Sequence, residues 1–329
     1  MTNFNIELSE DTYYKCDYSA LYTTSGAETF CFEYKEGVHK IIFQSIKRKI
    51  SEVAGVKIEG DFYDLETAYG YGGPVSNCDD AIFFANAFKA YKHECASQSI
   101  VCEFIRFHPF NPLCKHSELY DFHSQERTVV IVNLELSTEG RWAKYSKTTR
   151  NILRKANKKL QRVKESNGLD DFCKLYELTM KKNNASEFYF FQKEYFNQLN
   201  NVSGVELLSV ELDGETVSTG FFMHGKEIAH YHLSANNSDL LRENGNYALL
   251  DYAFENAKEK GCRWMMLGGG RTSDENDSLF KFKTKFSDQV LPFYIAGLDF
   301  LPEKRAELNA IWKTNNNDNK LNMFQLYRM

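Results

Sequence analysis

The sequence predicts a mixed α/β fold with mainly antiparallel central sheets, in which two domains of similar design follow each other along the chain. Three observations support this prediction. The chain has 329 residues, which is long enough for two domains with separate cores. Its second half contains a three-strand antiparallel meander, then a helix and a buried strand. The first half repeats the order hairpin, glycine-rich segment, helix and strand, although it does not repeat the residue identities.

The second half shows its elements most clearly. Helices are expected at 169–182 and 191–200, because apolar residues recur there at helical spacing. Three strands follow at 205–211, 215–224 and 227–235, and Asp213-Gly214 is the clearest hairpin signal between them. A helix is then expected over 246–260, ended by Gly261, and the buried strand 262–267 runs into three glycines.

The first half is expected to contain a hairpin that turns at Glu36-Gly37 and a buried strand at 100–109. Between them lies a helix whose buried face carries Phe84, Phe88, Tyr91 and Cys95. These elements predict three regions: an N-terminal domain over 1–140, a basic connecting helix over 141–165 and a C-terminal domain over 166–329.

The composition is that of a soluble globular protein with a net charge of −5, so nucleic-acid binding would require a local basic patch. The eight cysteines form no C-x-x-C pair. This argues against a structural zinc site and a disulfide framework, and it favours a reducing compartment. The first residues do not read as a signal peptide, and no apolar stretch approaches the roughly 20 residues of a membrane span. We therefore expect a cytoplasmic protein without a membrane span.

The segment 141–164 holds ten Lys or Arg residues and no Asp or Glu. Apolar residues from Tyr145 to Val163 form one stripe, whereas Arg150, Arg154, Lys158 and Arg162 repeat every four residues on another. The segment is therefore expected to be one amphipathic helix. Its basic face is either a solvated surface or a wall that binds an anion, such as phosphate, tRNA or an anionic lipid surface.

The loop Arg242–Tyr247 precedes a predicted helix, and a glycine-containing helix start offers backbone N–H groups and the positive end of the helix dipole. Its place after the meander resembles that of the pyrophosphate loop in GNAT acyltransferases, whose pattern is Q/R-x-x-G-x-G/A. Arg242 and Gly245 match this pattern, whereas Tyr247 stands where a small residue is expected. The alternative is a plain surface turn.

The strand EIAHYHLSA is expected to place His230, His232 and Ser234 on one face and Tyr231 on the other. His232 is a candidate general base, because an imidazole accepts a proton near neutral pH. The alternative is a structural histidine. No third ligand with suitable spacing is evident, so a metal site is not expected.

The stretch LGGGRTSDENDSLFKFKTKF, residues 267–286, joins three glycines to a lysine-rich segment. A helix that begins at Asp277 would align Leu279, Phe282 and Phe286 on its inner face, with Lys283 beside Phe282. The alternatives are a strand that gathers Lys281, Lys283 and Lys285, or an ordinary surface helix.

Several short motifs occur in an order that is similar to one known family. They are YGYGGP, FIRFHP, RNILRKA, AHYHLSA, LGGG and DSLFKFKTKF. Together they resemble the FemAB-like aminoacyl- and acyltransferases of the GNAT superfamily (FemA, FemB and FemX), from about residue 60 to residue 300. The resemblance implies two GNAT-like domains in tandem. It also implies transfer of an acyl or aminoacyl group from acyl-CoA or aminoacyl-tRNA to an amine of a cell-envelope precursor.

The resemblance also implies roles for individual residues. Lys283 and Phe282 would lie at the reaction centre, with His232 and Tyr231 as further catalytic candidates. Candidates for donor binding are Arg242, Gly245, Asn246, Gly269, Gly270 and Arg271. Candidates for acceptor binding are Tyr69, Gly70, Tyr71, Gly72, Gly73 and Arg106. Arginine grips phosphate or carboxylate, and a Gly-Gly turn admits a phosphate to the backbone.

The sequence lacks the long coiled-coil arm of FemA and FemB, a departure that FemX-like members share. The expected partners are a sugar-linked or nucleotide-linked precursor of peptidoglycan or surface polysaccharide and, for an aminoacyl donor, tRNA. No tightly bound cofactor is expected. An alternative function is a non-catalytic module that binds a nucleotide-sugar or RNA, and another is a peripheral membrane protein that uses the basic segment.

Overall fold

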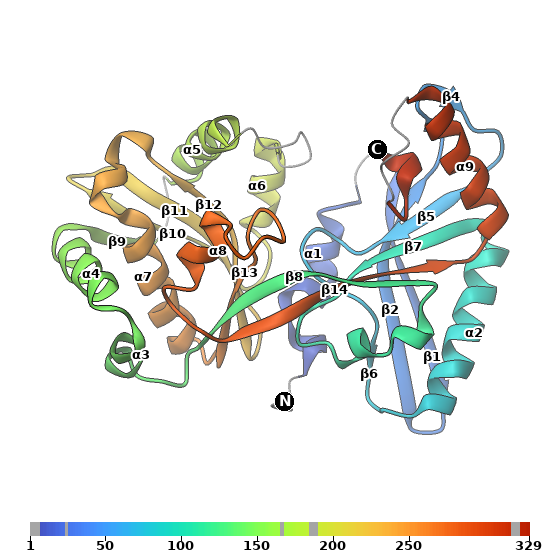
Figure 1. Cartoon of the computed structure of the whole chain (residues 1–329), viewed down its shortest axis with the longest axis horizontal. Helices are drawn as coiled ribbons and strands as arrows, with labels where there is room; N and C mark the ends of the chain where they lie inside the picture. The colour runs from blue at the N-terminus through green and yellow to red at the C-terminus, as the bar shows by residue number, and fades with distance from the viewer. Residues whose placement is uncertain (1–6, 24–25, 165–167, 184–189, 317–322) are drawn as a thin grey trace. The chain divides into compact units, whose positions relative to one another are not determined.

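The structure is a computed structural model that describes residues 7–23, 26–164, 168–183, 190–316 and 323–329. The chain forms two compact units (Figure 1). Unit 1 contains Tyr22–Glu126 and Pro292–Met329, and unit 2 contains Asn5–Leu21 and Arg127–Leu291. The expected boundaries at 140 and 165 therefore do not coincide with these units, because each unit takes residues from both halves of the sequence.

Unit 1 is a sheet covered by α2. The strands β1, β2 and β5 are antiparallel neighbours, β7 is parallel to β5, and β14 is antiparallel to β7. The expected hairpin is confirmed, since Glu36 pairs with His39 across a turn in which Gly37 has φ +60°. The elements are β1 (Ala27–Glu36), β2 (His39–Lys49), β3 (Glu52–Val53), β4 (Val56–Lys57), β5 (Tyr63–Glu66), β6 (Val75–Ser76), α2 (Ala81–Ser97), β7 (Ile100–Arg106), β14 (Val290–Asp299) and α9 (Pro302–Asn315).

Unit 2 repeats this topology. The meander β10, β11 and β12 is antiparallel, β13 is parallel to β12, and β8 is antiparallel to β13. The elements are α1 (Cys16–Ala20), β8 (Phe122–Asn133), α3 (Thr138–Lys144), α4 (Lys147–Lys159), β9 (Gln161–Lys164), α5 (Gly168–Lys182), α6 (Lys193–Leu199), β10 (Val205–Leu212), β11 (Glu215–His224), β12 (Ile228–Asn236), α7 (Gly245–Glu259), β13 (Trp264–Gly268) and α8 (Ser278–Lys283). The predicted repeat of one α/β design is thus confirmed.

One exchanged strand in each sheet explains why the units cross the expected boundaries. In sequence β8 follows β7, yet its second half completes the sheet of unit 2. In the same way β14 follows β13 in sequence, yet most of it completes the sheet of unit 1. The first half of the sequence therefore supplies β8 to the sheet of unit 2, and the second half supplies β14 to the sheet of unit 1.

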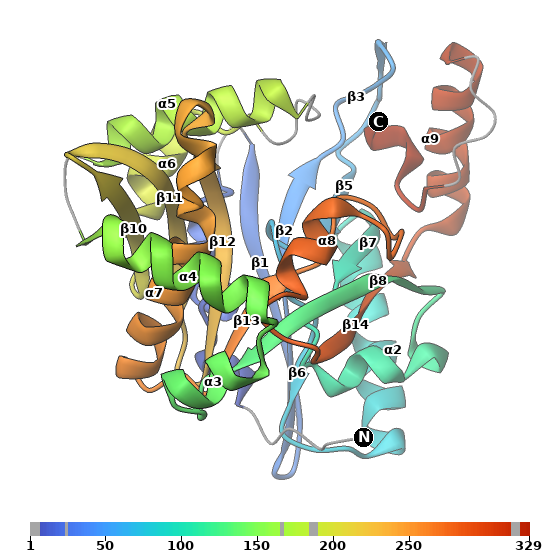
Figure 2. The same ribbon diagram turned by 60° about the vertical axis from the view of Figure 1, so that its left-hand side comes forward.

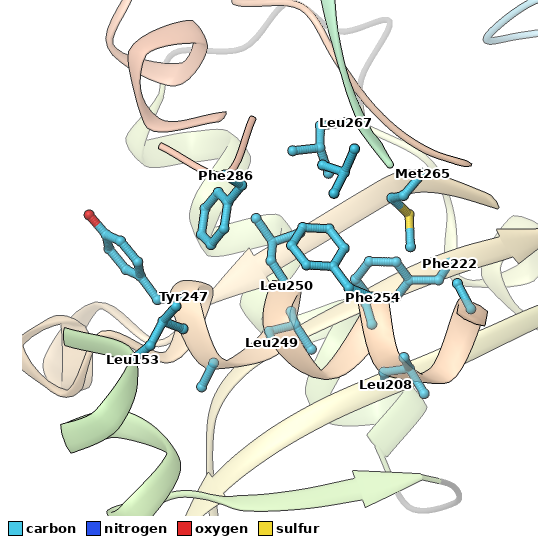
Figure 3. Close-up of a cluster of buried hydrophobic side chains, with 14 of the residues drawn as sticks. Leu153, Leu208, Phe222, Tyr247, Leu249, Leu250, Phe254, Met265, Leu267 and Phe286 are labelled. Atoms are coloured by element: carbon cyan, nitrogen blue, oxygen red, sulfur yellow. The ribbon is translucent and has the colours of Figure 1, made fainter. Parts of the chain in front are cut away.

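The core of unit 2 lies between its sheet and α7 (Figure 3). Leu208 and Phe222 of the sheet contact the α7 side chains Leu250 and Phe254, and all four are fully buried. Burial of such side chains contributes about 1.5–3 kcal/mol each. α4 packs beside α7 through Leu153 (Figure 2). On the other face of the sheet, α5 and α6 pack against Phe221 through Phe172 and Phe196.

The core of unit 1 lies between α2 and its sheet. The four α2 residues predicted to be buried, Phe84, Phe88, Tyr91 and Cys95, are all buried. The ring of Tyr91 stacks on Phe43 of β2 at 4.0 Å between centroids.

The basic segment is not one helix, so that prediction was wrong. It forms α3, α4 and β9, and these elements belong to unit 2. The break comes at Ser146, whose hydroxyl accepts a hydrogen bond from Thr149 N at 3.1 Å and caps a new helix. After Leu160 the chain becomes extended and β9 pairs with β10. The expected boundary after residue 165 lies outside the described residues.

Within the described residues, no helix combines the length and apolar character that crossing a membrane requires.

Candidate active site

Lys283 is held in unit 2 by the short helix α8. The helix begins where the sequence predicted, because the Asp277 carboxylate accepts hydrogen bonds from Leu279 N at 2.8 Å and Phe280 N at 3.0 Å. Lys283 closes the helix and is 7% exposed. Its amine donates to the carbonyl of Gly269 at 2.7 Å and lies 5.9 Å from the centre of the Tyr231 ring. The predicted lysine is therefore buried at the end of β13 rather than on the surface.

The environment of Lys283 favours its neutral form. Burial is the largest cause that lowers its pKa, to about 7, and the charge of Arg127 lowers it further while Asp277 raises it. Burial raises the pKa of Asp277, but backbone N–H groups led by that of Phe280 outweigh this effect and lower it. Asp277 is therefore a carboxylate at neutral pH, and the Lys283 amine exchanges its proton in the same range.

The glycines after β13 are required by close packing. Gly268 has φ +76°, which favours glycine. A Cβ on Gly269 would lie 2.9 Å from Arg127 Cδ, and one on Gly270 would lie 2.6 Å from Asp277 Oδ1. Arg127 Nη1 also donates to the Gly270 carbonyl at 3.0 Å. These glycines therefore bring β8, the loop and the start of α8 together, while their predicted contact with a donor stays a prediction.

Arg127 was missed by sequence reasoning. It lies in β8, far from Lys283 in the sequence, and no local pattern marks it. Arg271, a predicted donor-binding residue, is exposed and donates to the Ser278 hydroxyl at 3.0 Å.

A β-bulge in β12 changes which side chains share a face. Phe221 pairs with Leu233, whereas Phe222 pairs with Tyr231, so His232 is the extra residue. The hydroxyl of Tyr231 consequently bonds that of Ser234 on the face that carries α7. The predicted alternation, which placed Ser234 with the histidines, was wrong for this reason.

His232 lies on the opposite face, towards α6. Its two ring nitrogens are 3.2 Å from the Tyr13 hydroxyl and 3.4 Å from the Tyr195 hydroxyl. Burial, and to a smaller extent the charge of His230, lowers its pKa to about 3. The structure thus brings Tyr231 and Lys283 together and turns His232 away from them, and the general-base role of His232 remains untested.

The start of α7 lies against the sheet of unit 2. A Cβ on Gly245 would lie 2.6 Å from Val217 Cγ1, so only glycine permits this approach. The N-cap residue Asn244 has φ +57° and no side-chain capping bond, and the first turn contains no acidic residue. Such a helix start favours a bound anion. The neighbouring side chains of Arg242 and Asn246 could also donate hydrogen bonds to this anion. The role of Arg242, Gly245 and Asn246 in donor binding stays a prediction.

Tyr247 is the bulky residue at the position where the GNAT pattern expects a small one, and its packing explains why it is tolerated there. Its ring is buried and meets Phe282 edge-on at 5.1 Å between centroids. Its hydroxyl accepts a hydrogen bond from Lys285 at 2.8 Å. Tyr247 and Phe282 therefore join the first turn of α7 to α8, which fixes Lys283 relative to the helix start.

The predicted acceptor residues lie together in unit 1. Gly72 forms a parallel bridge with Phe107, and its N–H donates to the Arg106 carbonyl at 2.8 Å. Gly73 has φ +91°, and a Cβ there would lie 2.7 Å from the Phe107 ring. The guanidinium of Arg106 is paired with Glu66 at 3.3 Å, so an anionic ligand would have to compete with this carboxylate. The other candidates, Tyr69, Gly70 and Tyr71, are half-buried.

A pocket of about 390 Å³ lies in unit 2 beside the segment that follows α8. Arg141, Lys144 and Lys285 are among its lining residues, and the buried Arg141 forms an ion pair with Glu255. None of the predicted site residues lines this pocket.

Part of the chain matches a known protein family, and the fold is shared with several solved structures. Residues 147–283 match a family described as an acetyltransferase (GNAT) domain. A crystal structure of FemX superposes with a TM-score of 0.69 at 12% identity, covering 94% of this chain and 99% of FemX. The C-terminal domain of a putative lysylphosphatidylglycerol synthetase from Agrobacterium fabrum gives 0.53 at 16% identity, with 87% of each chain covered. The structure of L-PGS from Bacillus licheniformis gives a TM-score of 0.53 at 16% identity, with 87% of this chain and 88% of L-PGS covered.

The curated proteins include no match. The predicted resemblance to FemAB-like GNAT proteins is confirmed at the level of the fold.

Proposed function

We propose that this chain, which carries a GNAT acetyltransferase domain and shares the FemX fold, transfers an acyl or aminoacyl group to an amine of a cell-envelope precursor. The observation that carries the proposal is the Lys283 amine, buried at the end of β13 and hydrogen-bonded to Gly269. A buried amine with a pKa near 7 is typical of functional sites.

The chemistry follows from the charge that develops during acyl transfer. Attack of an amine on the acyl carbonyl produces a tetrahedral intermediate with a negative oxygen. The Lys283 ammonium stabilises this oxygen and donates a proton to the departing oxygen or sulfur as the carbonyl forms again. Because its pKa is close to neutral, the amine releases that proton more readily than an ordinary lysine. The neutral Lys283 amine then takes up the proton that the acceptor nitrogen releases.

The donor is an acyl-CoA or an aminoacyl-tRNA, both of which are found in the cytoplasm, and both carry phosphates. The start of α7, with Arg242, Gly245 and Asn246, is suited to those phosphates. One structurally similar protein is described as a putative lysylphosphatidylglycerol synthetase, a name that refers to a lysyl group. This similarity supports an aminoacyl donor. The exposed cations of α4, including Arg154 and Lys158, suit the tRNA backbone in that case.

The acceptor is a sugar-linked or nucleotide-linked precursor with a free amine. We assign Tyr69–Gly73 as the acceptor segment, because its tyrosines can pack on a sugar and its glycines can admit a phosphate to the backbone. Arg106 would exchange Glu66 for an anionic group of the acceptor.

Replacement of Lys283 tests the function. Lys283→Met should lower the rate of acyl transfer by about 10²–10³-fold, because a group that stabilises the oxyanion is lost. The melting temperature should stay the same or rise, since a buried charge is replaced by an apolar side chain.

Lys281→Met is the matched control, because Lys281 lies in the same helix but is exposed and bonds Asn276. The assay combines each donor with amino-sugar and peptide-bearing nucleotide acceptors and follows the acceptor mass. Equal rates for Lys283→Met and wild type would refute the site, and binding without any mass gain would favour the non-catalytic module.

A further inference from the structure

Two cations meet at consecutive carbonyl groups of the glycine loop. Lys283 Nζ donates to Gly269 O at 2.7 Å, and Arg127 Nη1 donates to Gly270 O at 3.0 Å. The aliphatic part of Arg127 also touches Gly269, where a Cβ would lie 2.9 Å from Cδ. Arg127 therefore contacts both glycines, one of which accepts the hydrogen bond of Lys283.

The charged groups around Lys283 differ in sign. Asp277 caps α8 and favours the ammonium form, whereas Arg127 of β8 opposes it. Tyr231 of β12 presents its ring to the amine, and burial raises the pKa of its phenol, so it is neutral. Among the described residues, Arg127 is thus the side chain whose charge acts against a proton on Lys283.

We propose that Arg127 is a positioning residue, which holds the Gly269-Gly270 loop in place beside Lys283 and puts a second positive charge at that loop. This inference rests on the proposed function for its catalytic meaning. A lysine without this neighbour would hold its proton more tightly and deliver it to the departing group less readily, although burial, the larger cause, would still lower its pKa.

The ionisation of Lys283 can be measured without an activity assay. Protein labelled with carbon-13 at the lysine ε-carbon is titrated by NMR, and Lys283→Met identifies the Lys283 signal. In the wild type we expect a midpoint near 7. Arg127→Gln should raise it by about one pH unit, since an opposing unit charge is removed at short range.

Two further variants separate charge from structure. Arg127→Lys keeps the charge and should keep the wild-type midpoint, while acyl transfer slows because the forked contact with Gly270 is lost. Lys281→Gln removes an exposed cation of α8 and should change neither the midpoint nor the rate. If Arg127→Gln fails to fold, Arg127→Met serves as the uncharged variant with the same expected shift.

The proposal is overturned if the uncharged variants titrate at the wild-type midpoint, or if Lys281→Gln shifts it equally. This failure is distinct from failure of the proposed function. An unchanged midpoint refutes the role of Arg127, whereas full activity of Lys283→Met refutes the acyltransfer site and leaves the titration result intact.

Discussion

At the scale of single residues, Lys283 and Glu103 are buried ionisable side chains whose hydrogen bonds go to neutral groups. Lys283 bonds a backbone carbonyl, and Glu103 of unit 1 accepts a hydrogen bond from the Tyr91 hydroxyl at 2.9 Å and another from Ser45. Burial raises the pKa of Glu103 to about 7, although both hydrogen bonds oppose the shift. We propose a chemical role for Lys283, whereas we expect Glu103 to affect the stability of the protein.

Glu103 should make the protein less stable as the pH rises. Its pKa is raised from 4.5 in the unfolded chain to about 7 in the folded protein, so its contribution is complete below 4.5 and is lost as the pH rises through 7. The full change is roughly 3 kcal/mol. Glu103→Gln should remove this part of the pH dependence in chemical denaturation between pH 5 and 8. Parallel curves for the variant and the wild type would disprove the assignment.

The site residues that could be predicted are those marked by a local pattern. Asp277 is a good helix start, and the spacing from it placed Phe282 on the inner face with Lys283 beside it; the structure shows that Lys283 ends the helix. Arg127 could not be predicted, because it reaches the site only through the pairing of β8 with β13. His232 was assigned to the same face as Ser234 because a β-bulge has no clear signal in one sequence.

At the scale of elements, close contacts between backbones decide the site. α7 approaches β11 so closely at Gly245 that a methyl group would meet Val217 at 2.6 Å. The strands and helices with regular apolar spacing were predicted correctly, including the meander and α7. The basic segment was not, because the Ser146 cap and the pairing of β9 override a helical pattern of charges.

Gly245→Ala should displace the first turn of α7. We expect a loss of about 1–3 kcal/mol in the free energy of unfolding from overpacking, together with a raised KM for the donor. Gly140→Ala is the control, since a Cβ there would have its nearest contact at 3.5 Å inside helix α3. The control should be stabilised by about 0.5–1 kcal/mol. Equal stability and an unchanged donor KM for Gly245→Ala would rule out the tight packing described.

At the scale of the whole molecule, each compact unit depends on both halves of the sequence. The repeat could be predicted from the order of elements, but the exchange of β8 and β14 could not. Pairing between strands that are distant in the sequence produces no local sequence pattern. The order of such strands in the sheet is decided by packing in the folded core. The expected C-terminal domain, 166–329, therefore lacks Val130, Val132 and Leu153 of the unit 2 core.

A fragment of residues 166–329 should consequently fail to unfold cooperatively. Circular dichroism during heating would show a broad transition for this fragment, and the full chain would show a sharp one. We expect the broad transition because the fragment lacks β8 and α4, so the core residues that they cover in the full chain become exposed. A sharp transition for 166–329 at the temperature of the full chain would show that the units are independent of the exchanged strand.

The central claim is that the buried amine of Lys283 stabilises the transition state of acyl transfer. It is tested most directly by a single turnover with saturating donor, comparing wild type, Lys283→Met and Lys281→Met. We predict a transfer rate about 10²–10³-fold lower for Lys283→Met alone, with donor affinity retained. A wild-type transfer rate in Lys283→Met would contradict the account.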